Sequence, residues 1–239
     1  MKHFVYFSNS AATSGKALSD GNLMKAGRMD IAIHSLIQGV FLSHDFRKDV
    51  VFHFIFYGMP DPPKHLEIQV KDETIISKKD VAKIIQKMLY KYKEGTKTEV
   101  FPGCFIEKKS FLDVVDELIK EGKEIFILDK NGEDIREIKI SKEPVFILGD
   151  HDGLPQKEMK RLKQVATSVS VADLDSCFLV FYNNIVKLFA QNYSIFIIRP
   201  DIKYTSMTTN KITHGNTTII GRMKNNMIIF FTCFKITFI

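Results

Sequence analysis

The sequence predicts an α/β domain over residues 1–190, with a mostly parallel sheet covered by helices, and an irregular extension over residues 191–239. Segments typical of strands and of helices alternate along the predicted domain, as in folds built on a parallel sheet. The segment VFILG (145–149) is almost entirely apolar, which is typical of a strand covered on both faces. The composition, 45% hydrophobic and 26% charged, is that of a globular protein with a substantial core.

Three strands and two helices are predicted in the N-terminal half. Aromatic and β-branched runs indicate strands at 3–8, 50–58 and 65–70. Apolar residues at helical spacing predict a helix within 23–42. A second helix follows Ser77-Lys-Lys-Asp80, which resembles a capping box with Asp in place of Glu. Gly95 ends this helix, and its predicted apolar face consists of Val81, Ile84, Ile85, Met88 and Leu89.

The C-terminal half continues the alternation. Ser110 is the predicted N-cap of a helix whose inward residues are Leu112, Val115, Leu118 and Ile119. Asn131-Gly132 is a strong hairpin signal, so residues 135–140 are expected to return as a strand. Further strands are predicted at 124–129, 145–149 and 166–171, and further helices from Pro155 and over 176–190.

The extension differs from the domain in composition and charge. From Gln191 onward there is no Leu, Val, Ala or Glu. Its 49 residues include six basic residues and one acidic residue, so it carries +5 of the total charge of +6. Two interpretations stay open: an extension with β-prone segments, or a stretch with little selection for structure, which we favour. The nearly neutral domain by itself gives no general nucleic-acid signature.

Other features of the sequence favour a cytoplasmic protein. The apolar runs fall short of a membrane span, and the N-terminus lacks the apolar region of a signal peptide. The three cysteines, Cys104, Cys177 and Cys233, are too few and too widely spaced for a disulfide framework.

Candidate sites are expected in loops at strand ends, where α/β sheets bind ligands. The sequence contains no GxGxxG, P-loop, GxSxG or HExxH motif. Three groups of residues are candidates instead: 27–30 with 42–49, 57–63, and 148–155. Each also has a purely structural interpretation, respectively a charged helix end, a rigid proline turn and a tight turn between strand and helix.

No metal is expected from the sequence. The pairs His44-Asp45 and His151-Asp152 lack the further patterned ligands that a hydrolase of the His-Asp type needs. Cys177 starts a predicted helix, where a thiol is a candidate nucleophile, but a small core residue is the simpler interpretation.

Several of these segments together resemble one family. They are GRMD (27–30), FLSHDFRKDVVF (41–52), YGMPDPP (57–63), ILDKNGEDI (127–135) and PVFILGDHDGLP (144–155). In this order they are similar to the archaeal tRNA pseudouridine-54 N1-methyltransferases, which belong to the SPOUT class of knotted methyltransferases. The resemblance covers about residues 1–190, and the extension has no counterpart in it.

The resemblance implies a C-terminal trefoil knot, a homodimer with sites at its interface, tRNA as substrate and S-adenosylmethionine as cofactor. Cofactor contacts are expected at Leu128, at Gly149 and near Cys177, although the loop before Cys177 is a few residues shorter than is usual in the family. True knots are rare, so no periodicity in the sequence could predict this one.

The chemistry follows from the substrate. The N1 atom of pseudouridine carries a proton and acts as the nucleophile, so methylation needs alignment with the methyl group, loss of that proton and no covalent enzyme intermediate. Asp30 is the expected proton-handling residue and Arg28 is expected to steer the RNA. Arg47 and Lys48 are candidate phosphate contacts, or else pair structurally with Asp45 or Asp49.

Two alternatives to this function stay open. One is a pseudouridine methyltransferase that acts on ribosomal RNA. The other is a non-catalytic RNA-binding factor of the same fold, which the shortened loop and the unusual extension would suit. Cofactor binding separates the enzymes from the non-catalytic factor, and nucleoside analysis of tRNA separates the two enzymes.

Overall fold

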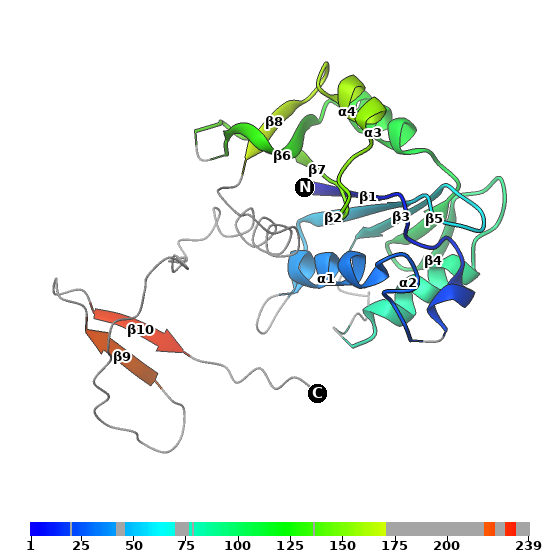
Figure 1. Ribbon diagram of the computed structural model, residues 1–239, viewed down its shortest axis with the longest axis horizontal. Coiled ribbons are helices and arrows are strands. Elements are labelled where there is room, and N and C mark those ends of the chain that lie inside the picture. The colour runs from blue at the N-terminus through cyan, green and yellow to red at the C-terminus, as the bar shows by residue number, and fades with distance from the viewer. Residues whose placement is uncertain are drawn as a thin grey trace. The chain divides into compact units, whose positions relative to one another are not determined.

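An eight-stranded mixed sheet forms the centre of the main part of the chain in a computed structural model (Figure 1). The structure describes residues 1–19, 21–41, 46–69, 77, 79–135, 137–170, 218–222 and 228–232. The strand order is β4-β5-β3-β2-β1-β7-β6-β8. The strands are β1 (Lys2–Ser8), β2 (Val50–Phe56), β3 (Lys64–Gln69), β4 (Thr98–Phe101), β5 (Cys104–Glu107), β6 (Glu124–Asp134), β7 (Pro144–Leu148) and β8 (Thr167–Ser170).

Five neighbouring strands of this sheet are parallel. β1 pairs with β2 on one side and β7 on the other, and β6 pairs with β7 and β8. On the far side of β2, the strands β3, β5 and β4 continue the sheet in antiparallel pairings. The prediction of a mostly parallel α/β sheet is confirmed for these five of the eight strands, from β2 to the edge strand β8, whereas the antiparallel pair β4–β5 was not predicted.

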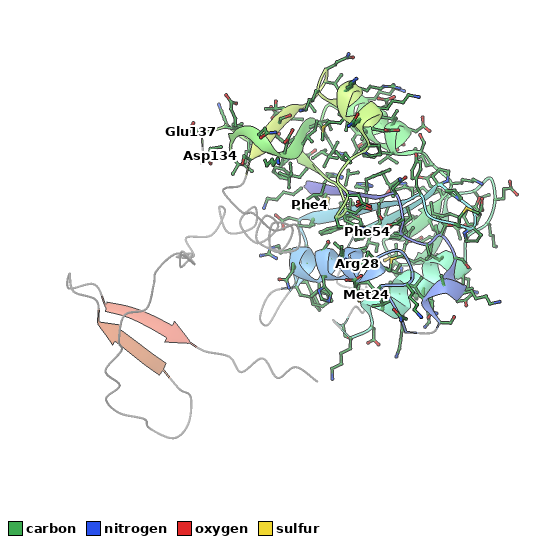
Figure 2. All side chains as sticks on the ribbon, in the orientation of Figure 1. Phe4, Met24, Arg28, Phe54, Asp134 and Glu137 are labelled. Atoms are coloured by element: carbon green, nitrogen blue, oxygen red, sulfur yellow. The ribbon has the colours of Figure 1, made fainter. Side chains whose placement is uncertain are left out.

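Helices cover both faces of the sheet (Figure 1). α1 (Met29–Val40) and α2 (Val81–Tyr90) pack on one face, and α3 (Phe111–Lys120) and α4 (Gln156–Leu162) pack on the other. A short 3-10 helix, η1 (Gly15–Leu18), precedes α1. The α1 face is lined by phenylalanines that stack across neighbouring strands, including Phe4 and Phe54, labelled in Figure 2, with Phe52, Phe126 and Phe146. This aromatic layer forms much of the larger core.

The predicted helix caps have different outcomes. The Ser110 hydroxyl accepts a hydrogen bond from the Asp113 backbone N–H at 3.2 Å, which confirms the predicted cap of α3. Ser77 does not cap α2, because its hydroxyl donates to the Asp80 carboxylate at 2.5 Å and the helix begins after Asp80. All five predicted apolar residues of α2 are buried. The helix predicted within 23–42 is α1, which begins at Met29.

The prediction of a hairpin at Asn131-Gly132 is wrong. β6 runs through both residues to Asp134, and residues 135–140 contain no described strand. β6 pairs with β8 in two registers, with a shift between Leu128 and Glu133. A Cβ on Gly132 would lie 2.5 Å from the Val169 backbone nitrogen, so the glycine permits close approach of two strands rather than a reversal.

The chain divides into two compact units, Met1–Ile195 and Phe196–Ile239. The described part of the second unit is an antiparallel pair, β9 (Thr218–Arg222) and β10 (Ile228–Thr232). The helix predicted at 176–190 and Cys177 within it lie outside the described residues. Within the described segments, no helix combines the length and the hydropathy needed to span a bilayer.

Three buried histidines form a hydrogen-bonded row across the face that α3 covers. His3 Nδ1 lies 3.0 Å from His53 Nε2, and His53 Nδ1 lies 3.0 Å from His65 Nε2. His65 Nδ1 lies 2.9 Å from Glu107 Oε1, so this ring donates its proton to the carboxylate. The row therefore joins β1, β2, β3 and β5 through side chains as well as through backbone pairing.

These histidines predict a loss of stability in mild acid. Burial lowers the pKa of His3 from 6.5 to about 4, and burial lowers the pKa of His53 well below 6.5. At a pH between the pKa of the unfolded chain, about 6.5, and the lower pKa of the folded chain, these histidines are protonated only in the unfolded chain. The free energy of unfolding therefore falls as the pH falls from about 6.5 to about 4. Each histidine contributes a slope of up to about 1.4 kcal/mol per pH unit.

Urea unfolding in metal-free buffer at several pH values between 7 and 4 measures this slope. His3→Gln keeps a hydrogen-bonding side chain at the end of the row and is expected to reduce the slope by roughly one histidine's contribution. A slope that is the same in the variant and the unaltered protein would show that His3 is not responsible.

Candidate active site

The loops that follow β1 and β7 are joined by a buried carboxylate. The Ser8 hydroxyl donates to Asp150 Oδ2 at 2.7 Å, and the Asn9 backbone N–H donates to the same oxygen at 3.2 Å. The Ser8 oxygen in turn accepts from the backbone N–H of Ala11 at 3.0 Å. Because β1 and β7 are adjacent and parallel, this contact fixes two loops at the carboxyl edge of the sheet.

The other Asp150 oxygen organises its own loop. Oδ1 accepts from the Asp152 backbone N–H at 2.9 Å, and the Asp150 carbonyl accepts from the Gly153 N–H at 2.9 Å. Gly153 has a φ of +78°, which glycine adopts without steric cost. A Cβ on Gly149 would lie 2.5 Å from the Gly153 carbonyl carbon, so Gly149 lets the loop fold back on itself.

The chain enters α1 through a strained turn. Gly27 and Arg28 both have positive φ values, +72° and +59°, and Arg28 is the one described residue other than glycine in that region. A Cβ on Gly27 would lie 1.7 Å from the Ser10 carbonyl oxygen, and the Ser10 hydroxyl donates to the Gly27 carbonyl at 3.2 Å. The loop after β1 therefore holds this turn in place, as strained backbone at functional sites requires.

Arg28 and Asp30 form a bidentate ion pair at this turn. Arg28 Nε donates to Asp30 Oδ1 and Nη2 donates to Oδ2, each at 3.1 Å. The side chains are 31% and 21% exposed, so a bound molecule can reach both. Tyr6 is buried on β1, and its pKa is raised first by burial and then by the charge of Asp150, with a smaller effect of Asp30. The phenol therefore stays protonated beside two carboxylates.

The loop after β2 completes this edge of the sheet. The Gly58 N–H donates to the Ala11 carbonyl at 3.0 Å, and the Thr13 hydroxyl donates to the Gly58 carbonyl at 2.8 Å. Asp61 binds Lys108 and the buried Lys64, and these two lysines lower the pKa of Asp61 to about 2. This anchored loop carries Met59, whose side chain is 75% exposed beside the site.

The two described residues with a predicted cofactor contact lie at the same edge. Parallel pairing of Ile127 with Ile147 places Leu128 of β6 level with the end of β7, which Gly149 follows. Leu128 is half-buried and pairs with Val169 of β8. It supplies an apolar surface beside the loop after β7, whose first residue is Gly149. Cys177, the third predicted contact, lies outside the described residues.

Arg47 and Lys48 lie at the opposite edge of the sheet, because they precede β2. The Arg47 guanidinium donates to the carbonyls of Gln38 and Gly39 at the end of α1, at 3.2 and 3.4 Å. Of the two partners considered for them, Asp49 pairs with Lys2, and Asp45 lies outside the described residues. The structure therefore brings Arg28 and Asp30 together but separates them from Arg47 and Lys48.

Sequence reasoning missed the residues that hold the site together. Tyr6, Ser8 and Thr13 were not predicted, and Asp150 was noted only as part of its loop. A signal was present in Ser8-Asn9-Ser10, a polar run directly after a buried strand that pairs in parallel.

Sequence comparisons assign the chain to one family, and a solved structure shares its fold. A family model described as "SAM-dependent RNA methyltransferase" matches residues 1–189. The chain is 33% identical to the tRNA (pseudouridine(54)-N(1))-methyltransferase of Methanococcus aeolicus, over 78% of this chain and 98% of that protein. It is 32% identical to the enzyme of the same name from Methanocaldococcus jannaschii, over 77% and 95%. The structure of Archaeoglobus fulgidus Nep1 bound to S-adenosylhomocysteine has a similar fold, with a TM-score of 0.54, 10% identity and coverage of 81% and 99%.

The Asp150 contacts predict a large and specific loss of stability. Asp150→Ala leaves the N–H groups of Asn9 and Asp152 and the Ser8 hydroxyl without their acceptor, so we expect destabilisation by about 2–4 kcal/mol. Asp152→Ala removes an exposed carboxylate two residues away, keeps its backbone N–H and is expected to cost less than about 0.5 kcal/mol. Urea unfolding of both variants tests this, and equal losses would contradict it.

Proposed function

Because the chain belongs to the family of SAM-dependent RNA methyltransferases, we propose that it transfers the methyl group of S-adenosylmethionine to N1 of pseudouridine 54 in tRNA. The observation that carries this proposal is the 33% identity to a tRNA (pseudouridine(54)-N(1))-methyltransferase across 98% of that protein's length. The loop after β1 supports it, because this loop contacts both the turn that carries Arg28 and Asp30 and the glycine-containing loop after β7.

The reaction needs one bond to form, one to break and one proton to leave. The bound cofactor supplies an electrophilic methyl group on a sulfonium. As N1 bonds to the methyl carbon, the carbon–sulfur bond breaks and S-adenosylhomocysteine is released. Arg28 occupies one lone pair on each Asp30 oxygen, so each oxygen keeps another for the N1 proton. We assign Asp30 as proton acceptor and Arg28 as the residue that orients it and attracts the phosphates of the RNA.

Leu128 and Gly149 are the described residues that we assign to the cofactor, with Cys177 as a further candidate from the sequence. Leu128 would contact the adenine ring, and the backbone around Gly149 would supply polar contacts. A C-terminal trefoil knot and a homodimer are parts of the same proposal, supported by family membership. Since tRNA is the substrate, we place the enzyme in the cytoplasm.

Product analysis tests the proposal directly. The purified full-length chain, incubated with S-adenosylmethionine and tRNA that carries pseudouridine at position 54, is expected to yield N1-methylpseudouridine by mass spectrometry. The same tRNA with uridine 54 should give none, because N1 of uridine is bonded to ribose. Methylation of ribosomal RNA alone would favour the alternative substrate, and absence of cofactor binding by calorimetry would favour a non-catalytic factor.

Substitution of the ion pair separates its two roles. Asp30→Asn removes the proton acceptor and is expected to lower kcat by about 10²-fold or more. Arg28→Lys keeps the charge but loses the bidentate geometry, with an expected loss of about 10-fold in kcat/KM. The matched control is Lys25→Gln, a change at an exposed residue three positions before Arg28, which removes a positive charge outside the ion pair and should leave kcat unchanged. An Asp30→Asn enzyme with normal kcat would exclude Asp30 as proton acceptor.

Residues 1–190 are proposed to carry the activity, and the extension to add only non-specific affinity for RNA. A chain ending at Ala190 is therefore expected to keep its kcat at saturating tRNA and to bind tRNA more weakly at low salt, because five net positive charges are removed. Light scattering should give a dimer for both lengths. A shortened chain that binds cofactor but transfers no methyl group would place the extension in the active site.

A further inference from the structure

A cluster of metal-binding side chains lies on the α3-covered face of the sheet, away from the carboxyl edge. His53 of β2 faces Glu67 of β3 in the strand register, and His65 lies two residues before Glu67 on the same face. One ligand atom from each of the three lies within 4.8 Å of the others. The two histidines are buried, and Glu67 is 23% exposed.

Each histidine of this cluster is held by a further polar side chain. His65 presents Nε2 to the cluster, and its Nδ1 bonds Glu107 at 2.9 Å. His53 presents Nδ1, and its Nε2 lies 3.0 Å from His3 Nδ1. Metal-binding histidines typically donate their second ring proton to a carboxylate or another acceptor in this way, which fixes the ring and the tautomer. Glu107 and His3 can both accept such a proton.

From this arrangement we propose that His53, His65 and Glu67 bind a structural zinc ion. Two imidazole nitrogens and one carboxylate are a ligand set that zinc accepts, with water as the fourth ligand. Two nitrogens on one tetrahedral zinc ion lie about 3.3 Å apart, given bonds of about 2.0–2.1 Å. His53 Nδ1 and His65 Nε2 are hydrogen-bonded to each other at 3.0 Å, so zinc would replace this hydrogen bond with a small widening of the pair. The proton between them would move to His53 Nε2, which would then donate to His3 Nδ1.

The local charges are compatible with zinc. Glu67 and Glu107 are the carboxylates at the cluster, and each also faces a lysine: Lys97 lies 2.7 Å from Glu67, and Lys109 lies 3.7 Å from Glu107. Lys97 is 44% exposed, so loss of this pair costs little. Lys97 also lies 5.1 Å from the centre of the Phe105 ring, a contact that it can keep. Burial favours the neutral imidazole that coordination requires.

The zinc ion would fasten the antiparallel part of the sheet to the parallel part. β2 is the last parallel strand, β3 the first antiparallel one, and the supporting side chains come from β1 and β5. The ion would lie near the middle of β2, whereas Arg28 and Asp30 lie beyond the carboxyl ends of the parallel strands. The role assigned to it is therefore stabilisation rather than catalysis.

Zinc titration of the EDTA-treated full-length chain tests the proposal. Calorimetry is expected to show one zinc ion bound with sub-micromolar Kd, and Tm is expected to rise with zinc concentration because only the folded chain forms the site. Co²⁺ in place of zinc should give the strong visible absorption of tetrahedral coordination. Absence of saturable binding in the folded protein would overturn the proposal.

Three variants locate the ion. Glu67→Gln removes one ligand and leaves the histidine row intact, so we expect at least 10-fold weaker binding. Glu107→Gln removes the support of His65 and should weaken binding by about 10–100-fold. The matched control is Asp152→Asn. Asp152 belongs to Asp150-His151-Asp152, the other described group with metal-binding side chains. The Asp152→Asn protein should bind zinc as tightly as the unaltered chain. Circular dichroism in EDTA checks that each variant is folded. If the Glu67→Gln protein binds zinc with the same Kd as the unaltered chain, the ion lies elsewhere and the assignment is refuted.

Discussion

The parallel pairing of β1 with both β2 and β7 is the constraint on which the site depends. It places the ends of three strands from distant parts of the sequence at one edge. Backbone hydrogen bonds set this alignment along the whole of β1, and the Ser8–Asp150 hydrogen bond extends it beyond the strand ends. A buried carboxylate is costly unless its oxygens accept hydrogen bonds, and Asp150 accepts three from side-chain and backbone donors. The same bonds that satisfy Asp150 therefore fix two loops of the site.

The strained entry into α1 depends on that rigidity. A left-handed Arg28 costs free energy that the isolated segment would not sustain, and the loop after β1 supports the turn through Ser10. The turn directs the Arg28 side chain toward Asp30, in the first turn of the same helix. A conventional helix start would have no reason to bring residues two positions apart face to face. The sequence order Arg-Met-Asp thus becomes a bidentate pair only because of this backbone conformation.

Local patterns were enough to predict the parallel strands and most of the helices, because burial imposes a regular spacing on them. The Ser110 cap and the apolar face of α2 were predictable for that reason. The hairpin prediction at Asn131-Gly132 failed because a glycine in a strand-like segment can mark either a turn or a close contact between two strands. The second explanation depends on β8, which is distant in the sequence and packs against Gly132. The pairing of Arg28 with Asp30 and the histidine row needed three-dimensional alignment. His3, His53 and His65 are 50 and 12 residues apart and meet only through strand order.

The two edges of the sheet have different chemistry, and this bears on how RNA can lie on the protein. A strand of seven residues such as β2 spans about 20 Å. Lys48 and Arg47 are separated from Arg28 by that length, while the Arg47 guanidinium already binds carbonyls at the end of α1. Within one copy of the chain, they would reach phosphates well away from the nucleotide that we propose Arg28 and Asp30 bind. Recognition of the target base is then a task for the carboxyl edge alone, and the amino edge contributes, if RNA reaches it, only the sequence-independent attraction of its positive charge.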